Sequence, residues 1–352
     1  MIAMSGGVDS SVAALLTQRE GYECTGAMMR LFSNEEIGIE GESRCCSLDD
    51  AEDARSVAHR IGMPFFVFNF SDKFRDCVIE KFVRTYKRGA TPNPCIDCNR
   101  FLKFERFFLR AQEMGIDHIV TGHYATVYYD DVSHRWGLRK GIDDSKDQSY
   151  VLYALTQEQL AHTLLPLGTM TKKKVRAIAE ENNFINARKR ESQDICFVPD
   201  GDYAAFIERY TGEPLKAGDF VDTHGNVVGR HRGFVRYTIG QRRGLGLSLR
   251  EPLYVCAKRA QDNTVVLGKS NELFSKSLTA SDINLITCEK INSPIRVKAK
   301  TRYRQREAWA TVEQIGDSRI RVDFDVPMRA ITSGQAVVLY DGDIVVGGGT
   351  ID

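Results

Sequence analysis

The sequence predicts an α/β fold in its first part, with a parallel sheet covered by helices, and an antiparallel β-barrel at its end. Up to about residue 200, short apolar segments alternate with amphipathic segments of helical period, which is typical of parallel strands joined by helices. After Gly201, glycine becomes frequent and the apolar pattern changes to a period of two, which indicates antiparallel strands. We therefore predict a first domain at residues 1–200, a small central domain at 201–274 and a barrel at 275–352.

Local signals define the elements of the first part. Residues 1–4 are apolar and predict a short strand. Residues 47–62 predict a helix, because Ser47 is a suitable N-cap, acidic residues fill the first turn and Gly62 can end it. The other predicted strands are 21–32, 64–70 and 117–130, and the other predicted helices are 72–89, 101–115 and 171–184.

No long helix is expected beyond Gly201. Segments of period two predict strands at 229–240, 251–258 and 263–269, and then at 296–316, 318–325 and 335–349. Alternate side chains of a strand share one face. Five cations of the strand at 296–316 are therefore expected to line one surface: Lys298, Lys300, Arg302, Arg304 and Arg306.

Composition predicts a globular protein of the cytoplasm. Apolar residues make up 42% and charged residues 27% of the chain, which are ordinary values. No segment approaches the roughly 20 apolar residues of a membrane span, and the first residues lack the features of a secretory signal. Nine cysteines without an export signal argue against a disulfide scaffold and favour catalytic, redox or metal roles for clustered cysteines.

Charge is balanced overall but uneven along the chain. The formal net charge of +1 favours no class of partner. Residues 227–250 hold six arginines and no acid, and residues 294–306 hold six lysines or arginines and no acid. Such basic stripes suit a polyanion. A solvated face balanced by acids from other segments is the alternative.

The opening segment MIAMSGGVDSS predicts a phosphate-binding loop. A strand that ends in a Gly-rich turn and starts a helix directs backbone N–H groups into one concavity, where the helix dipole favours an anion. The Walker A pattern fails because Val8, not lysine, follows the second glycine, and the dinucleotide-binding pattern fails because there is only one pair of glycines. We expect the serines of the loop to add hydroxyl donors and Asp9 to orient a metal ion or a substrate group.

Three cysteines are candidates for chemistry. Cys95 and Cys98 form a Cys-x-x-Cys within TPNPCIDCN, at a turn that leads into a helix, and Cys196 lies in SQDICF. A thiol near a helix start is acidified, so Cys98 is predicted to be a thiolate near neutral pH. A four-cysteine zinc site would need a second Cys-x-x-Cys pair. The cysteines expected to be buried and inert are Cys24, Cys77, Cys256 and Cys288, and those left without a role are Cys45 and Cys46.

These motifs resemble the tRNA-specific 2-thiouridylases of the ATP pyrophosphatase loop superfamily. The resemblance implies a Rossmann-like adenine-nucleotide α-hydrolase domain with a parallel sheet, a small central domain and an antiparallel barrel. It also implies an ATP-dependent sulfurtransferase that adenylates the wobble uridine of tRNA at C2, replaces O2 with sulfur, and releases AMP and pyrophosphate. The motifs span nearly the whole chain in order: SGGVDSS, TPNPCIDCN, TGHYA, KDQSYVLY, SQDICF, YTIGQRRGLG, KTRYRQ and GQAVVLYDG.

The resemblance also implies roles for individual residues. Cys98 would be the nucleophile, and Cys196 would carry a persulfide from an upstream donor such as a cysteine desulfurase or a sulfur relay protein. The nucleotide ligands would be ATP and Mg²⁺. The implied ATP contacts are Ala3, Met4, Ser5, Gly6, Gly7, Val8, Asp9, Ser10, Met29 and Gly122, and the implied contacts to the anticodon stem-loop of tRNA are Asn93, Pro94, Cys95, His123, Lys146, Asp147, Gln148, Arg302, Tyr303 and Gln335.

Alternatives stay open at this point. Many family members carry Asp at the position of Cys95, so in this chain Cys95, Cys98 and Cys196 could hold an iron–sulfur cluster. We favour the persulfide relay, in which Cys98 and Cys196 pass through a disulfide. A ligase of the same loop superfamily that acts on a small molecule would need neither basic stripes nor paired thiols, and a non-catalytic RNA-binding module would not need the loop.

Overall fold

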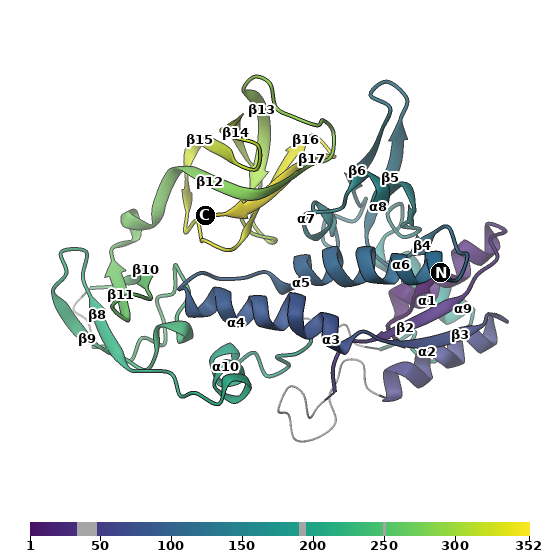
Figure 1. Cartoon of the computed structure of the whole chain (residues 1–352), viewed down its shortest axis with the longest axis horizontal. Helices are drawn as coiled ribbons and strands as arrows, with labels where there is room; N and C mark the ends of the chain where they lie inside the picture. Colours follow the sequence, from purple (N-terminus) through teal and green to yellow (C-terminus); the bar gives the residue numbers. More distant parts are fainter. Residues whose placement is uncertain (34–47, 190–194, 249–250) are drawn as a thin grey trace.

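The computed structural model describes residues 1–33, 48–189, 195–248 and 251–352. Figure 1 shows the parallel sheet at one end of the molecule, a small central sheet at the other, and long helical segments between them, with the barrel above these segments. The expected N-cap Ser47 lies outside the described residues, as do Cys45 and Cys46.

The parallel sheet predicted for the first part is present, with five strands. Successive side chains of its first strand in the sequence lie on opposite faces of the sheet. Ile2 and Met4 pack into one hydrophobic core, and Met1 and Ala3 pack into another. Helices therefore cover both faces. In spatial order the strands are β3 (Phe65–Asn69), β2 (Gly26–Arg30), β1 (Ile2–Ala3), β4 (Ile119–Val120) and β7 (Thr163–Leu164), and the helices of the first core are α1 (Val8–Arg19), α2 (Leu48–Arg60) and α9 (Lys172–Glu181).

Two long helical segments contribute to the second core and extend beyond the sheet (Figure 1). The second segment begins at Pro94 and not near residue 101 as predicted, because proline is well suited to the first helical turn. Cys95 and Cys98 therefore lie in the first turns of a helix and not in a turn before it. The segments are α3 (Ser71–Phe74), the π-helical η1 (Arg75–Ile79) and α4 (Glu80–Lys87), and then α5 (Pro94–Asp97), the π-helical η2 (Cys98–Arg106) and α6 (Phe107–Glu113).

The prediction of one strand at residues 117–130 is wrong. The chain leaves the parallel sheet after β4, and β5 (Ala125–Asp130) pairs with β6 (Arg135–Lys140) as an antiparallel hairpin. This hairpin continues the sheet of the barrel through β17 (Ile344–Ile351). Both halves of the segment are rich in β-forming residues, so the local pattern did not reveal the break between two sheets.

A short helix follows Gly201, in the part of the chain for which no long helix is predicted. The carboxylate of Asp202 caps the start of α10 (Tyr203–Thr211), and Gly212 ends it in the left-handed conformation. The helix is too short for its period to stand out in the sequence. Within the described residues, no helix is long and apolar enough to cross a membrane. Two other short helices are α7 (Ser149–Leu152) and α8 (Gln157–Ala161).

The central part contains a four-stranded sheet around a small core that includes Phe220 and Tyr237. The predicted strand at 229–240 ends at His231, and a 3₁₀ turn, η3 (Phe234–Arg236), replaces the rest. In spatial order the strands are β10 (Tyr254–Arg259), β11 (Thr264–Gly268), β8 (Gly218–Val221) and β9 (Val227–His231), and a second 3₁₀ turn, η4 (Ser270–Leu273), leads to the barrel.

The barrel is closed, because its first strand pairs with its last. The predicted strand at 296–316 is split after Lys300, where the hydroxyl and N–H of Thr301 donate to the side-chain oxygen of Gln305 and close a turn. The prediction that five cations share one surface of a strand is therefore wrong, because the three arginines at 302–306 lie beyond the end of this strand. In ring order the strands are β12 (Phe274–Leu285), β15 (Ile320–Arg329), β14 (Ala308–Gln314), β13 (Ile295–Lys300), β16 (Ala336–Asp341) and β17.

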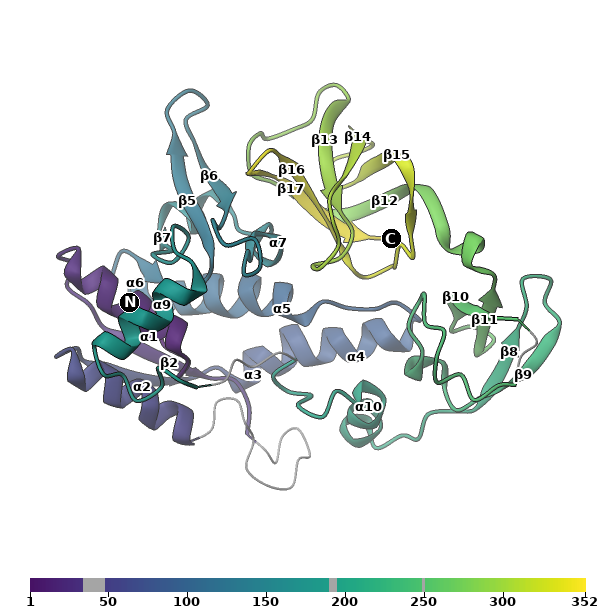
Figure 2. The ribbon, with the colours of Figure 1, turned by 180° about the vertical axis from the view of Figure 1, so that it is seen from behind.

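Polar contacts fix the barrel to the first part. The N–H of Thr91 donates to the Ser333 carbonyl at 2.9 Å, and Arg100 in η2 pairs with Asp282 in β12 at 2.7 Å. Figure 2 shows from behind that the barrel stands over α5 and beside α7. The barrel is thereby held next to the segment that carries Cys95 and Cys98.

Candidate active site

The predicted phosphate-binding loop connects β1 to α1. Gly6 has φ +72°, and a Cβ there would lie 2.4 Å from the Asp50 carbonyl oxygen, so only glycine fits. Gly7 is the N-cap of α1 and offers no side chain to the free N–H groups of the first turn. The loop thus presents backbone donors at a helix N-terminus, the arrangement that favours a phosphate.

The serine hydroxyls shape the loop instead of pointing away from it. The Oγ atoms of Ser10 and Ser11 both donate to the Gly7 carbonyl, at 3.0 and 3.1 Å. The N–H of Ser5 donates to Ser10 Oγ at 3.2 Å. We expected these hydroxyls to serve as donors for a ligand, but in this structure Ser10 and Ser11 donate within the loop.

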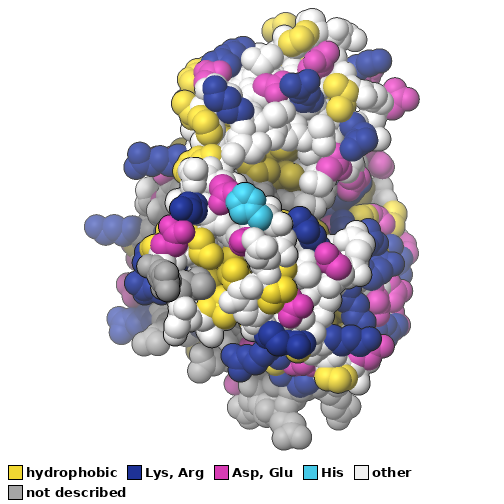
Figure 3. All heavy atoms as spheres, turned by 90° about the vertical axis from the view of Figure 1, so that its left-hand side faces the viewer, with side chains coloured by type: hydrophobic (Ala, Val, Ile, Leu, Met, Phe, Trp, Pro, Cys, Tyr) yellow, Lys and Arg dark blue, Asp and Glu magenta, His cyan; other side chains and the backbone are white. Residues whose placement is uncertain are grey.

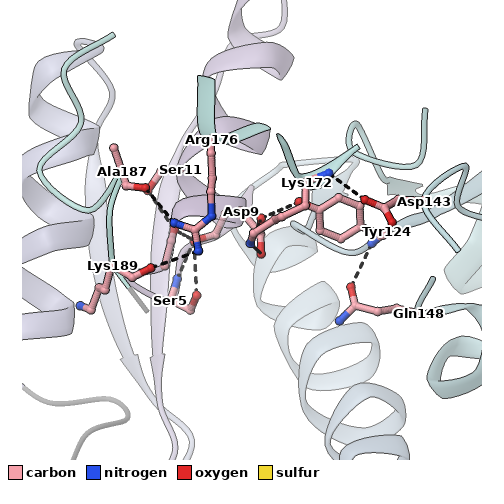
Figure 4. A network of polar contacts seen from close by, with 12 residues as sticks. Ser5, Asp9, Ser11, Tyr124, Asp143, Gln148, Lys172, Arg176, Ala187 and Lys189 are labelled. Carbon is pink, nitrogen blue, oxygen red and sulfur yellow. Dashed lines mark hydrogen bonds and ion pairs between the residues drawn. The ribbon is translucent and has the colours of Figure 1, made fainter. Parts of the chain in front are cut away.

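Asp9 has two partners that the sequence analysis did not identify as site residues (Figure 4). The Lys172 ammonium lies 2.7 Å from each carboxylate oxygen, and Tyr124 donates its hydroxyl to Oδ1 at 2.7 Å. Lys172 is buried, with 8% of the residue exposed. Its backbone N–H donates to Asp143 at 2.9 Å, which fixes the start of α9.

Residues that follow Lys172 in the chain contact the phosphate-binding loop and the neighbouring helix α2. The buried Asn186 donates from Nδ2 to the Gly6 carbonyl and to Ser11 Oγ, both at 2.9 Å. Lys189 pairs with Asp50 and Asp53 of α2. The sequence carried one signal for this group: α9 begins with three lysines and no acid, although the helix dipole disfavours cations there.

Gly122 and Met29, two predicted ATP contacts, lie at the same edge of the sheet as the loop. Gly122 follows β4, and a Cβ on it would lie 2.7 Å from the Ser10 nitrogen, so the close approach requires glycine. Met29 lies near the carboxyl end of β2, next to β1. Ligands of open α/β sheets bind at the carboxyl ends of the strands, so the predicted contacts converge on one edge.

The prediction that Cys98 is acidified is wrong. Burial raises the pKa of the Cys98 thiol to about 11, and the nearby charge of Lys103 opposes this only in part. Cys98 lies past the first helical turn, where the dipole effect has faded. Cys95, one turn earlier, is exposed. Cys98 is therefore protonated at neutral pH in the free protein.

Cys196 lies next to an aromatic cluster that connects it to the Cys98 segment. Phe197 packs against Phe82 of α4 with ring centroids 5.1 Å apart. The neighbouring Lys81 pairs with Asp97 at 2.6 Å, and Asp97 precedes Cys98. Cys98 and Cys196 also pack against the same hydrophobic core. Both cysteine segments therefore contact α4.

The other cysteines expected to be buried and inert are only half-buried. These are Cys24, Cys77, Cys256 and Cys288. Burial raises the pKa of Cys24 and of Cys256. No disulfide links any of the cysteines that the structure describes.

The two candidate metal groups are Mg²⁺ and an iron–sulfur cluster, and the residues present suit one better than the other. Mg²⁺ prefers one or two carboxylates together with phosphate and water oxygens, and Asp9 at the loop supplies such a carboxylate. An iron–sulfur cluster needs several thiolates around one point. Among the described residues, which include Cys95, Cys98 and Cys196, no three Cys, His, Asp or Glu side chains gather as a metal site. The three cysteines do not fit a cluster in this arrangement.

Alkylation should distinguish Cys95 from Cys98. In native protein at neutral pH, iodoacetamide is expected to modify Cys95 first, because Cys95 is exposed whereas Cys98 is half-buried and its raised pKa keeps it protonated. The Cys98 rate should rise about tenfold per pH unit toward its pKa of about 11, as its thiolate fraction rises. Peptide mass spectrometry after timed alkylation gives both rates. Equal modification of the two thiols at pH 7 would contradict the burial of Cys98.

Several residues implied to contact tRNA meet around the Cys95 segment. Tyr303 donates its hydroxyl to the Asp147 carbonyl at 2.9 Å. Gln335 donates from Nε2 to the carbonyls of Thr91 and Pro92, both at 3.0 Å. Barrel residues thus contact two segments of the first part, residues 91–95 and 146–148. Asn93, Pro94, Lys146 and Gln148 belong to these segments.

His123 and Arg302 are less accessible than a nucleic-acid contact would require. The ring of His123 is buried, with Nδ1 2.6 Å from Thr121 Oγ1, and burial lowers the pKa of His123 well below its usual value, so the ring is neutral. Arg302 Nη2 donates to the carbonyls of Ile239 and Ala330 and to Thr332 Oγ1. Arg302 therefore joins the central part to the barrel.

Acids from other helices and strands neutralise part of the basic stripes. Arg236 pairs with Glu208 at 2.6 Å, and Arg296 pairs with Asp325. Figure 3 shows basic and acidic side chains interspersed at this end of the molecule. The basic stripes are therefore not uniformly positive. Some stripe arginines are exposed and have no acidic partner among the described residues: Arg242, Arg243, Arg304 and Arg306.

Three family models match successive parts of the chain. They are the tRNA methyl transferase HUP domain at residues 1–200, the tRNA methyl transferase PRC-barrel domain at residues 204–269 and the aminomethyltransferase beta-barrel domain at residues 275–351.

Two solved structures are similar to part of the chain, with low TM-scores. The NMN synthetase of Francisella tularensis covers 61% of this chain and 77% of its own, with 14% identity and a TM-score of 0.32. The U34-tRNA thiolase NcsA of Methanococcus maripaludis, solved with its [4Fe-4S] cluster, covers 60% of this chain and 68% of its own, with 16% identity and a TM-score of 0.34. Scores this low carry no argument.

Curated relatives match from end to end. The tRNA-specific 2-thiouridylase MnmA of Acetivibrio thermocellus is 53% identical, over 100% of this chain and 98% of the relative. The enzymes of the same name from Clostridioides difficile and Carboxydothermus hydrogenoformans are each 48% identical, over 100% of this chain and 97% of theirs. Identity of this extent, across the loop, the cysteine segments and the barrel alike, shows that the chain belongs to the tRNA-specific 2-thiouridylase family.

Proposed function

We propose that this protein is an ATP-dependent tRNA-uridine sulfurtransferase that converts the wobble uridine to 2-thiouridine. One observation supports this proposal above all. Barrel residues Tyr303 and Gln335 hydrogen-bond to the segments around Asp147 and Thr91. Cys95 and Tyr303 are exposed there, Asn93, Lys146 and Gln148 are half-buried, and none of these residues belongs to the phosphate loop. An extended substrate such as an RNA loop could contact them all, whereas a small molecule would not need them.

The first half-reaction activates the base. The free N–H groups at the start of α1 bind the phosphates of ATP, and Mg²⁺ at Asp9 would neutralise their charge when bound. The uridine, which is cheap to unstack in an anticodon loop, presents its O2 to the α-phosphorus. A bond forms between O2 and phosphorus, the bond to the pyrophosphate oxygen breaks, and pyrophosphate leaves.

The second half-reaction transfers sulfur through the two cysteines. An upstream donor leaves a persulfide on Cys196, and its terminal sulfur attacks C2, so that AMP departs with the former O2. Cys98 then attacks the Sγ of Cys196. The thiocarbonyl is released, a disulfide joins Cys98 and Cys196, and an external dithiol reduces that disulfide. Because the free Cys98 thiol is protonated, we expect substrate binding to precede its deprotonation.

A reconstitution tests the proposal. Purified protein is incubated with unmodified tRNA, MgATP, a cysteine desulfurase with cysteine as the sulfur source, and a dithiol reductant, and the nucleosides are analysed by mass. The expected result is 2-thiouridine, with AMP and pyrophosphate formed only when tRNA is present. A methylated nucleoside, or AMP formed with a small acceptor in place of tRNA, would overturn the proposal.

The role of Arg302 can be separated from that of its exposed neighbour. Arg302→Ala removes a donor from three acceptors, of which only the Ala330 carbonyl keeps another, the Thr332 hydroxyl. We therefore expect a loss of about 1–3 kcal/mol in the free energy of unfolding and an unchanged salt dependence of tRNA binding. Arg304→Ala is the matched control. Arg304 is exposed, so its loss should leave the melting temperature unchanged and lower the salt slope by roughly one.

Thermal melts and tRNA titrations over a salt series provide both readouts. A flattened salt slope in Arg302→Ala, with an unchanged melt, would show that Arg302 contacts phosphate after all. Unchanged slopes in both variants would move the RNA contact to the exposed pair Arg242 and Arg243 of the central part.

A further inference from the structure

Lys172 stands out among the buried charges at the phosphate loop. Its ammonium lies 2.7 Å from both carboxylate oxygens of Asp9, and the Asp9 side chain keeps 30% of its surface exposed. Tyr124 supplies the other hydrogen bond to Asp9. In the nucleotide-free protein, a lysine therefore holds the carboxylate that Mg²⁺ would use.

The backbone of Lys172 is fixed while its side chain can move. The Thr171 hydroxyl accepts from the N–H of Lys174, and Asp143 accepts from the N–H of Lys172, so the start of α9 is anchored on both sides. The lysine side chain beyond Cβ is flexible, and its ammonium donates in three directions. Rotation about these bonds can move the ammonium off Asp9 without moving α9.

Resting on the proposed function, we propose that Lys172 binds the phosphate chain of ATP and the departing pyrophosphate, and that Mg²⁺ replaces it at Asp9 when the nucleotide enters. Mg²⁺ bound to phosphates takes a carboxylate oxygen as a further ligand, and both Asp9 oxygens are otherwise bonded to the ammonium. The displaced ammonium has phosphate oxygens next to it as its new partners. This exchange also accounts for a lysine at a helix N-terminus, where the dipole is unfavourable unless an anion lies nearby.

The exchange predicts two opposite effects for Lys172→Met. Without the ammonium, Asp9 is open to cations, so nucleotide-free protein should bind Mn²⁺ about tenfold more tightly or better. Pyrophosphate with Mg²⁺ should bind about tenfold to a hundredfold more weakly, because a charge-assisted contact is lost. Mn²⁺ is measured by electron paramagnetic resonance, and pyrophosphate by calorimetry.

Two further variants make the comparison decisive. Lys173→Met removes the neighbouring exposed lysine and should change neither affinity. Lys172→Gln keeps an amide donor for Asp9 and guards against misfolding of the methionine variant; it should show the same two effects. If Lys172 only neutralises Asp9, its replacement should instead lower the melting temperature and leave pyrophosphate affinity unchanged.

Pyrophosphate affinity within twofold of wild type in both Lys172 variants would overturn the phosphate-binding role. Unchanged Mn²⁺ affinity would overturn the exchange. The tRNA thiolation assay with wild-type protein separates this inference from the proposed function. If wild type thiolates tRNA while Lys172→Gln binds pyrophosphate normally, only the inference fails. If wild type does not thiolate, the proposed function fails.

Discussion

In a single turnover without added dithiol, Cys98→Ser and Cys196→Ser are each expected to abolish the formation of free 2-thiouridine in tRNA while ATP and tRNA still bind. Neither residue belongs to the phosphate loop, and both pack against the core on the opposite side of the sheet from Val12 of α1. A hydroxyl in place of Cys196 cannot carry a persulfide. A hydroxyl in place of Cys98 cannot resolve the disulfide to the base, so product should stay attached to Cys196.

The two variants therefore fail at different steps. Cys98→Ser should accumulate tRNA bound covalently through Cys196, which a reductant releases, whereas Cys196→Ser should accumulate none. Cys77→Ser is the matched control, because Cys77 is half-buried against the same core and has no assigned role. Denaturing gel electrophoresis with and without dithiothreitol shows the adduct. Normal thiolation by either active-site variant would rule out the relay.

Asp9→Asn is expected to stop pyrophosphate release while tRNA binding persists. The amide keeps a hydrogen bond to the Tyr124 hydroxyl but loses the charge that holds a metal ion. Loss of one group that stabilises developing charge lowers kcat by about 10²–10³. Tyr303 and Gln335 of the barrel bond to residues outside the loop, so tRNA affinity and its salt slope should not change.

Asp143→Asn is the control for this substitution. Asp143 accepts from the Lys172 N–H and from Ser145, but it belongs to no loop contact, and an amide oxygen can still accept. Pyrophosphate release is followed by a coupled phosphate assay in the presence of tRNA. Release by Asp9→Asn at the wild-type rate would mean that the nucleotide phosphates bind elsewhere.

The sequence by itself determined the features that depend on local pattern. Alternation of helices and strands predicted the parallel sheet, and the Gly-Gly turn after an apolar stub predicted the phosphate loop. Gly62 was predicted to end a helix, and it lies just beyond α2 with φ +69°. In each case the neighbouring residues contain the physical reason, such as a positive φ or the period of one element.

Only the tertiary structure decided the features that depend on distant neighbours. Burial raises the pKa of the Cys98 thiol, because desolvation by the surrounding core outweighs the nearby charge of Lys103. Lys172 meets Asp9 across 163 positions of sequence, and Arg302 donates from Nη2 to carbonyls of the central part and the barrel. Charge and residue type were visible in the sequence, but the partner that each group meets was not. That partner determines whether a lysine faces a carboxylate or solvent, and whether an arginine is available to an RNA phosphate.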